Sequence, residues 1–504
     1  MRANKVIFIK NALILTVTGL IIRFIGMLFR IWLASAIGAE GIGLYSQVFS
    51  FYVLASAFAS TGINTAITRL VSEELAVGNI KGSGTVVKKC VAVTLFIAFV
   101  SFGLIFFGAE FISNRIIGDE RASEALKTLA FSLPFIGVSS CLKGYFIARK
   151  KTAPASSSQI FEQLVRIGLI VLLVGKTASG GIGESARAVV LGDTAAEGFS
   201  FLYIYIAFLI DRNRQNTRAG NARLGYSVLS KLKHIALPIT VGRYLNSLLR
   251  TAENVLVPKK LEEYGMNGSE ALSVFGVIKG MALPLIFFPA SFLNALSTLL
   301  IPEMSEAAAS GKKYKVKYTA EKCIHITLIS SLPIAVIFFY ASGPLSRLVY
   351  GDDQVGEIVK MLSPIIPLMY LDSVCDGLLK GLDEQFSVFR NSMIDSLVRL
   401  GLILIVLPRF ALNGFIGIMY LSNAFTCIMN LFRLKKVSGA QIKWFLWLIF
   451  PAVCALTAGT VFSLIIGHFA ISDLPFAIVY SAVTALVYLF IMIKFKCVSR
   501  EDLR

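Results

Sequence analysis

Charged residues are scarce in this chain of 504 residues, which excludes an ordinary water-soluble protein. They make up 16% of the sequence, whereas hydrophobic residues make up 56%. The mean hydropathy is +0.74, so the apolar residues cannot all be buried in a soluble core. Runs such as 91–107, 188–210 and 476–493 are long enough, or nearly so, to cross a bilayer as helices. They are continuous instead of alternating, which favours helices over an outer-membrane barrel.

Histidine and cysteine are too few and too scattered to indicate a metal centre. The sequence has 3 histidines, and its 7 cysteines form no C-x-x-C pair. The phosphate-binding pattern G-x-x-x-x-G-K-[ST] is missing as well, and no soluble stretch is long enough for a nucleotide-binding domain. We therefore expect a protein that is not an enzyme, with no catalytic residue, no metal and no bound cofactor.

Acidic residues are outnumbered by basic ones, 30 to 49, which gives a formal net charge of +19. Such a charge can indicate a nucleic-acid partner. Here, however, the basic residues gather in alternate short loops, as at 149–151, 212–223 and 312–317. Basic loops lie on the cytoplasmic side. We therefore expect a multi-pass protein of the cytoplasmic membrane with both termini inside, in contact with membrane lipids and with no nucleic acid.

The apolar runs predict an all-α protein with about fourteen transmembrane helices in two parallel six-helix repeats plus two C-terminal helices. The first six span about 8–35, 42–71, 89–108, 125–147, 158–174 and 188–210. The others span about 233–257, 270–301, 320–342, 357–379, 386–407, 411–432, 443–467 and 473–494. The predicted parts are a six-helix bundle at 1–210, a basic linker at 211–232, a second bundle at 233–436, and a helix pair with a short tail at 437–504.

An internal repeat supports the two halves. Five landmarks recur at one constant offset in numbering (322 − 89 = 233, for example): Lys89-Cys90 as Lys322-Cys323, Gly118-Asp119 as Gly351-Asp352, Pro134 as Pro367, Gly144 as Gly377, and 164–170 as 397–403. Six helices separate the copies, so both halves have the same orientation, as in transporters with parallel repeats. Such transporters bind their substrate between the halves and expose it alternately to each side.

Arginines within the predicted helices are the first candidates for a binding site. Arg23 and Arg30 are seven residues apart in one helix, and Arg243 and Arg250 repeat that spacing in the helix that begins the second half. Each pair therefore lies on one helix face, about 10 Å apart. A charge at membrane depth indicates a function by default, so we expect a cavity that binds an anion, with Lys279 and Lys143 as weaker candidates. Structural pairing between helices is the alternative, and for Arg250 the acid Glu253 is three residues away.

Acidic residues at membrane depth allow two other roles. Glu162–Arg166 and Asp395–Arg399 are each spaced by four residues and are predicted to be structural ion pairs. Asp372 and Asp376 are candidates for ion coupling or, alternatively, partners of an arginine. Asp193 and Glu197 are the remaining acids at this depth.

Several motifs carry a resemblance to a known family. They are Arg23-x-x-Gly26, GAEGIGLY at 38–45, STGINTAITR at 60–69 and Gln159-x-x-Glu162-x-x-x-Arg166. Together they resemble the polysaccharide-flippase branch of the multidrug/oligosaccharidyl-lipid/polysaccharide (MOP) exporter superfamily, in particular the stage V sporulation protein B type, which is related to the lipid II flippases. The resemblance covers nearly the whole chain.

The resemblance implies two MATE-like bundles around a central cavity, two extra C-terminal helices, and alternating access. Arg23, Arg30 and Arg243 match approximately the cationic positions of the lipid II flippases. The implied substrate is a polyprenyl-pyrophosphate-linked oligosaccharide or a cell-wall precursor of peptidoglycan or polysaccharide, with glycan-synthesis enzymes as candidate partners. A sodium gradient, a proton gradient and the membrane potential stay open as energy sources.

Three other functions compete with the flippase. A cation-coupled multidrug exporter would need a carboxylate-lined cavity, whereas most of the charges near the membrane midplane here are positive. A non-transporting accessory protein of envelope or spore-wall synthesis is a second alternative. A membrane glycosyltransferase would need a catalytic carboxylate in a sizeable outer loop, and the predicted outer loops are short.

Overall fold

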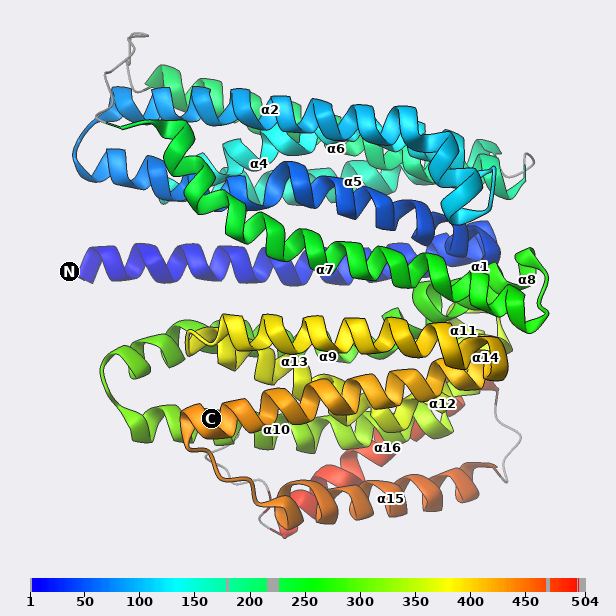
Figure 1. Cartoon of the computed structure of the whole chain (residues 1–504). Coiled ribbons are helices and arrows are strands. Elements are labelled where there is room, and N and C mark those ends of the chain that lie inside the picture. The colour runs from blue at the N-terminus through cyan, green and yellow to red at the C-terminus, as the bar shows by residue number, and fades with distance from the viewer. Residues whose placement is uncertain (1, 178–180, 215–225, 468–471, 496, 498–504) are drawn as a thin grey trace. The chain divides into compact units, whose positions relative to one another are not determined.

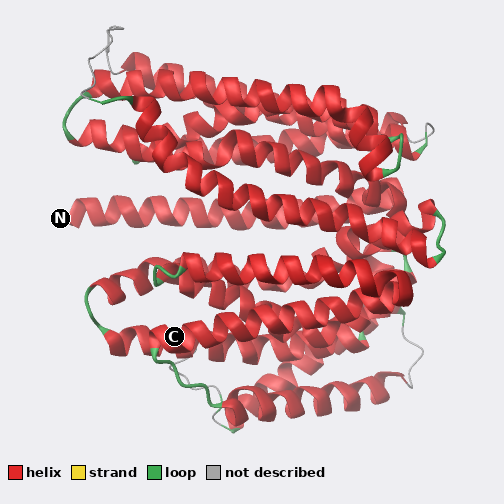
Figure 2. Ribbon diagram, viewed as in Figure 1, coloured by secondary structure: helices red, strands yellow, loops and turns green. Residues whose placement is uncertain are grey.

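A computed structural model describes residues 2–177, 181–214, 226–467, 472–495 and 497, and over these residues the chain is helical without strands (Figure 2). The α-helices are α1 (Arg2–Ala76), α2 (Ile80–Phe111), α3 (Ala122–Ala130), α4 (Ser132–Ala148), α5 (Thr152–Thr177), α6 (Ile182–Arg214), α7 (Val228–Tyr264), α8 (Gly268–Gly276), α9 (Leu283–Ala309), α10 (Lys313–Tyr340), α11 (Ser342–Tyr350), α12 (Asp353–Leu362), α13 (Ile366–Gly381), α14 (Gln385–Ser438), α15 (Phe450–Gly467) and α16 (Asp473–Lys494). Short π- or 3₁₀-helical segments also occur, namely η1 (Ile112–Ile117), η2 (Val277–Ala282), η3 (Ser363–Ile365) and η4 (Phe445–Ile449). The predicted all-α class is confirmed.

The number of membrane-crossing helices also agrees with the prediction. In the described part of the chain, eleven stretches are long and apolar enough to cross a membrane. Two of these stretches each consist of two helices joined at a kink, at Gly38 in α1 and at Ala411 in α14. The eleven stretches together therefore provide thirteen crossings. The fourteenth is α7, whose 37 residues include too many polar side chains to stand out by hydropathy.

The two kinks have different local causes. Gly38 has φ 71°, a backbone conformation that glycine adopts without steric cost. Ala411 has φ 45°, which strains a residue with a side chain, and it follows Pro408, whose ring interrupts helical hydrogen bonds. Both kinks lie where the sequence predicted a break between two helices.

The chain packs into two compact units, residues 1–29 with 36–258 and residues 30–35 with 259–504. In the first, α2 to α6 pack on one another (Figure 1). α7 packs on the second part of α1, where the Thr251 hydroxyl donates to the Ser50 carbonyl at 3.0 Å. In the second unit, α13 packs against α9, α10 and α14, and the last pair, α15 and α16, packs against α10. These two units are defined by which residues pack together. The predicted domain boundaries are instead defined by the internal repeat, and they stay a prediction.

The internal repeat is visible in local structure. Thr94 and Thr327, which the repeat relates to each other, each donate to the carbonyl of a buried cysteine four residues earlier, both at 2.7 Å. Gly118 and Gly351 both end a helical segment in the left-handed conformation, with φ 88° and 69°. Glycine is favoured at such an ending. The duplicated motifs therefore fold alike in each unit.

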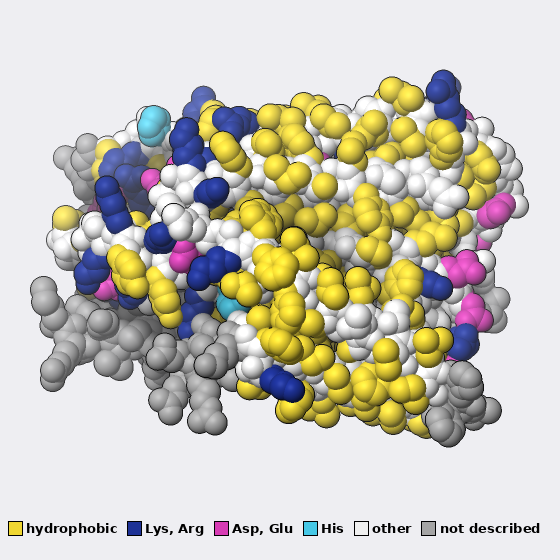
Figure 3. Space-filling model, turned by 90° about the horizontal axis from the view of Figure 1, so that it is seen from below, with side chains coloured by type: hydrophobic (Ala, Val, Ile, Leu, Met, Phe, Trp, Pro, Cys, Tyr) yellow, Lys and Arg dark blue, Asp and Glu magenta, His cyan; other side chains and the backbone are white. Residues whose placement is uncertain are grey.

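The surface of the molecule fits a membrane environment. On the face shown in Figure 3, hydrophobic side chains cover a broad middle zone, and lysine and arginine gather toward one end. Phe490 and Leu486 on α16 are 66% and 68% exposed. A broad surface of exposed apolar side chains is stable in lipid and unfavourable in water. Together with the candidate spans, they show a multi-pass membrane protein.

Candidate functional site

A cluster of charged side chains lies between α5 and α6 in the first unit. Glu162 and Arg166 are at positions i and i+4 on α5, and Asp193 and Glu197 are at positions i and i+4 on α6, so each pair lies on one helix face. The two helices pack along each other. Arg166 Nη2 lies 2.9 Å from Glu162 Oε1 and 3.5 Å from Glu197 Oε1. Arg166 Nε lies 3.0 Å from Asp193 Oδ1 as an ion pair without hydrogen-bond geometry.

Polar groups from neighbouring helices complete this cluster, which we call the Arg166 cluster. Lys143 Nζ on α4 lies 3.5 Å from Glu162 Oε2, and the Ser200 hydroxyl donates to the same oxygen at 3.0 Å. The hydroxyl of Tyr45 on α1 donates to Asp193 Oδ2 at 2.9 Å. The hydroxyl of Tyr52 lies 3.5 Å from Glu197 Oε1. With all groups ionised, three carboxylates face two cations.

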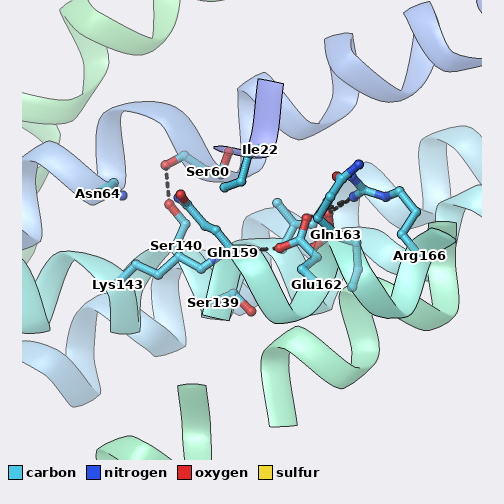
Figure 4. A pocket seen from close by; sticks show the side chains of 12 residues that line it. Ile22, Ser60, Asn64, Ser139, Ser140, Lys143, Gln159, Glu162, Gln163 and Arg166 are labelled. Carbon is cyan, nitrogen blue, oxygen red and sulfur yellow. Dashed lines mark hydrogen bonds and ion pairs between the residues drawn. The ribbon is translucent and has the colours of Figure 1, made fainter. Parts of the chain in front are cut away.

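A cavity of about 310 Å³ borders the cluster. Its lining is mostly polar and comes from α1, α4, α5 and α6: Ile22, Ser60, Asn64, Ile136, Ser139, Ser140, Lys143, Gln159, Glu162, Gln163, Arg166 and Glu197. Figure 4 shows Glu162 and Arg166 side by side on α5, with Lys143 reaching toward Glu162. The Ser139 hydroxyl is buried and has no hydrogen-bond partner among the described residues. The cavity thus offers polar groups to a small polar ligand or to water.

The corresponding part of the second unit is arranged differently. Asp395 and Arg399 form their predicted ion pair at 3.1 Å, and the Ser422 hydroxyl donates to Asp395 at 2.6 Å. Asp372 accepts a hydrogen bond from Asn430 at 2.9 Å. Asp376 forms an ion pair with Lys380 on its own helix at 2.5 Å. The two candidates for ion coupling therefore each have a partner, and the proposed coupling role stays a prediction.

The predicted anion-binding residues are divided between the two units. Arg243 and Arg250 lie in the first unit on α7 and are exposed. Neither forms an ion pair with a residue that the structure describes, so Arg250 does not pair with Glu253. Arg23 lies on α1, but its side chain falls outside the described residues.

Arg30 and Lys279 belong to the second unit. Arg30 is exposed on α1 and interacts electrostatically with Tyr350. Lys279 lies in η2 and is partly buried. An anion site made by the arginines at 23, 30, 243 and 250 with Lys279 therefore stays a prediction, and Lys143, the other weaker candidate, lies in the Arg166 cluster.

Packing determines which face of α7 presents its arginines. Thr240 and Thr251 contact the second part of α1, where the Gly62 amide donates to the Thr240 hydroxyl at 3.2 Å. Arg243 and Arg250 lie roughly a quarter-turn from this packed stripe. α7 therefore holds two guanidinium groups on one exposed stripe, two turns apart.

Sequence reasoning found some members of the Arg166 cluster and missed others. It identified Glu162 and Arg166 as a pair, and Asp193 and Glu197 only as acids at membrane depth. It did not predict that all four converge, because the rotation of α6 relative to α5 cannot be read from a helix period. Tyr45 ends the GAEGIGLY motif at 38–45, but nothing in that motif indicates that its hydroxyl contacts an acid on α6.

Comparison with known families decides the identity of the chain. The sequence profile of the family described as "Polysaccharide biosynthesis protein" matches residues 8–263, about half of the chain. The chain belongs to this family. A second profile, MatE, matches residues 238–408. Together with the relatives and the solved structures described next, these profiles place the chain among the polysaccharide flippases of the MOP superfamily, as the motifs indicated.

Individual relatives cover nearly the full chain. Stage V sporulation protein B of Bacillus subtilis (strain 168) is 27% identical, over 99% of this chain and 98% of that protein. The lipid II flippase MurJ of the same strain is 22% identical, over 86% of this chain and 84% of that protein. The chain is thus a MOP-superfamily membrane transporter related to flippases.

Solved structures show the same fold. The lipid II flippase MurJ in its inward closed conformation matches with a TM-score of 0.70 and 15% identity, over 95% of this chain and 98% of that one. An inward-facing multidrug resistance MATE family transporter matches with a TM-score of 0.63 and 14% identity, over 83% and 99%. The predicted MATE-like fold is confirmed.

Proposed function

We propose that this protein is a flippase that carries a polyprenyl-pyrophosphate-linked oligosaccharide or cell-wall precursor across the cytoplasmic membrane. The family and the full-length relatives support transport of a lipid-linked sugar. Alternating access between the two repeats is the mechanism we infer. The basic loops at 149–151 and 312–317 support an orientation with both termini in the cytoplasm.

The exposed arginine stripe on α7 carries the proposal. A charged side chain at the centre of a membrane helix costs about 2.5–3.5 kcal/mol on insertion scales. Arg243 and Arg250 bear this cost without an ion-pair partner among the described residues. A guanidinium group donates two parallel hydrogen bonds to a phosphate, which makes arginine well suited to hold a pyrophosphate. The lipid tail of such a substrate can stay in the bilayer while its headgroup crosses.

A reconstituted system tests this function. Purified protein in liposomes is given a fluorescent polyprenyl-pyrophosphate-linked sugar, and its accessibility is followed from each leaflet. The wild type should move the lipid between leaflets, and Arg243→Gln should abolish the movement. Arg409→Gln, at an exposed arginine beside the kink of α14, is the matched control and should retain it. Transport of a cationic dye in place of the lipid-linked sugar would instead identify a drug exporter.

A further inference from the structure

We propose that the first unit contains a buried proton-binding site shared by Glu162 and Glu197. This inference rests on the proposed transport function, because it names the ion whose binding would be linked to the transport cycle. The site lies in the Arg166 cluster, away from Asp372 and Asp376, the residues that the sequence suggested for ion coupling.

The charge balance of the Arg166 cluster requires a cation. Glu162, Asp193 and Glu197 contribute three negative charges, and Lys143 and Arg166 contribute two positive ones. Among the described residues, no further lysine or arginine forms an ion pair with these carboxylates. Asp193 and Glu197 are 6% and 8% exposed. A net charge at such a site is unfavourable because little water is present to solvate it, and one bound proton removes it.

The contacts of the three carboxylates indicate where the proton binds. Asp193 has Arg166 at 3.0 Å and accepts the Tyr45 hydroxyl at 2.9 Å, so its charge is well compensated. Glu162 has Arg166 at 2.9 Å and accepts the Ser200 hydroxyl at 3.0 Å. The nearest cation to Glu197 is 3.5 Å away. Glu197 is therefore the carboxylate that gains most from protonation.

Glu162 is the group that shares this proton. Both carboxylates approach the same Arg166 Nη2 atom, at 2.9 and 3.5 Å, and both line the same cavity. Two carboxylates in one site cannot both stay ionised at low cost, so one of them retains a proton. A protonated Glu197 can donate its proton to Glu162 and so join α5 to α6.

The other groups around the pair fit a proton better than a metal ion. Tyr45 and Tyr52 on α1 donate neutral hydroxyls, and Lys143 on α4 and Arg166 on α5 repel a further cation. The described residues contain no group of three or more His, Cys, Asp or Glu side chains placed to hold a metal ion. A proton needs only one carboxylate oxygen and a route to water.

The cavity supplies that route. Glu162 and Glu197 both line the space of about 310 Å³, which is large enough for several water molecules. The Ser139 hydroxyl lines the same space, is 2% exposed, and has no partner among the described residues. Buried hydroxyls are rarely left without a hydrogen bond, so Ser139 indicates water or another polar ligand in the cavity. Water there can carry the proton to the carboxylates.

Infrared spectroscopy of the full-length protein in lipid tests the site without requiring transport, because protonated and ionised carboxyl groups absorb at different frequencies. The difference spectrum between wild type and Glu197→Gln near neutral pH should show the loss of one carboxylic acid. Glu110→Gln is the matched control, because Glu110 is an exposed acid of the same unit paired with Lys127, and it should show no such loss. Lys143→Gln removes a cation, so the acid should then titrate at higher pH.

The outcomes separate this inference from the proposed function. A carboxylic acid lost in Glu197→Gln or in Glu162→Gln, and unaffected by sodium, supports the proton site even if the liposomes move no lipid-linked sugar. If no carboxylic acid is seen in either variant, the proton site is wrong, even if transport is observed. Displacement of the signal by sodium at fixed pH would also overturn it, because the site would then bind an alkali ion. If Glu197→Gln fails to fold, Glu162→Gln provides the same readout, and in Lys143→Gln an acid that does not titrate at higher pH than in the wild type would overturn the site.

Discussion

The two repeats of this transporter share their helices and one ion pair, Glu162–Arg166 in the first and Asp395–Arg399 in the second, but not their other charges. In the first half, Lys143 reaches Glu162 on the next helix. Its counterpart in the second half is Asp376, which pairs with Lys380 on its own helix. The offset of 233 residues between the repeats also makes Asp372 the counterpart of Ser139. Duplication has thus preserved the backbone, while the polar side chains joining the helices have diverged. This difference assigns separate roles to the halves and leads to the following predictions.

The largest effect is expected at Arg166. Arg166→Ala leaves Glu162, Asp193 and Glu197 without their shared cation, and breaking a buried ion pair costs about 3–5 kcal/mol. Arg399→Ala removes a cation of similar exposure, but the Ser422 hydroxyl still donates to Asp395. We expect most folded protein to be lost in the first variant and less in the second, as measured by fluorescence-detected size-exclusion chromatography. Equal losses would show that the two clusters contribute alike.

A smaller effect is expected at the diverged pair of positions. Lys143→Met removes a cation whose side chain is 15% exposed and which neutralises a buried glutamate, so it should cost about 2 kcal/mol. Asp376→Asn breaks a pair whose side chains are 31% and 50% exposed, and should cost at most about 0.5 kcal/mol. Thermal unfolding midpoints measured in one detergent provide the comparison. A larger shift for Asp376→Asn would reverse the assignment of roles.

The smallest effect concerns an acid outside the membrane-spanning segments. The Arg433 guanidinium, with help from Ser387, holds the pKa of Glu384 below its usual range. Because the folded pKa is lowered, this stabilisation is present above the unfolded value of about 4.3 and is lost as the pH falls through the folded pKa.

Exposure to solvent limits this contribution to about 0.5 kcal/mol. In Arg433→Gln the difference in melting temperature between neutral and acidic pH should be slightly smaller than in the wild type. An unchanged difference would mean that Glu384 does not contribute to acid sensitivity.

The helices could largely be predicted from the sequence, because apolar length and the constant displacement between the repeats are one-dimensional signals. α7, predicted at 233–257, is the exception, because its polar residues keep it from standing out by hydropathy. The positions of both kinks followed from breaks in the apolar pattern. The backbone conformations at the kinks, with φ 71° at Gly38 and φ 45° at Ala411, could not be predicted.

The site was predictable only where its contacts are local. Glu162–Arg166 and Asp395–Arg399 follow from a spacing of four residues on one helix. The contacts of Arg166 with Asp193 and Glu197 depend on how α6 rotates against α5. Ser139 belongs to the site only because its hydroxyl, unpaired among the described residues, lines the cavity, which the sequence does not show. None of these long-range relations leaves a periodic trace in the sequence.

Transport by charge variants at Arg243 tests the central claim most directly. In liposomes containing the fluorescent polyprenyl-pyrophosphate-linked sugar, Arg243→Lys should retain part of the wild-type rate, because lysine keeps the charge but loses the paired hydrogen bonds. Arg243→Glu should abolish transport through repulsion of the pyrophosphate, while the variant folds normally because Arg243 is exposed and forms no ion pair with a described residue. Undiminished movement of the lipid-linked sugar by folded Arg243→Glu protein would contradict the account.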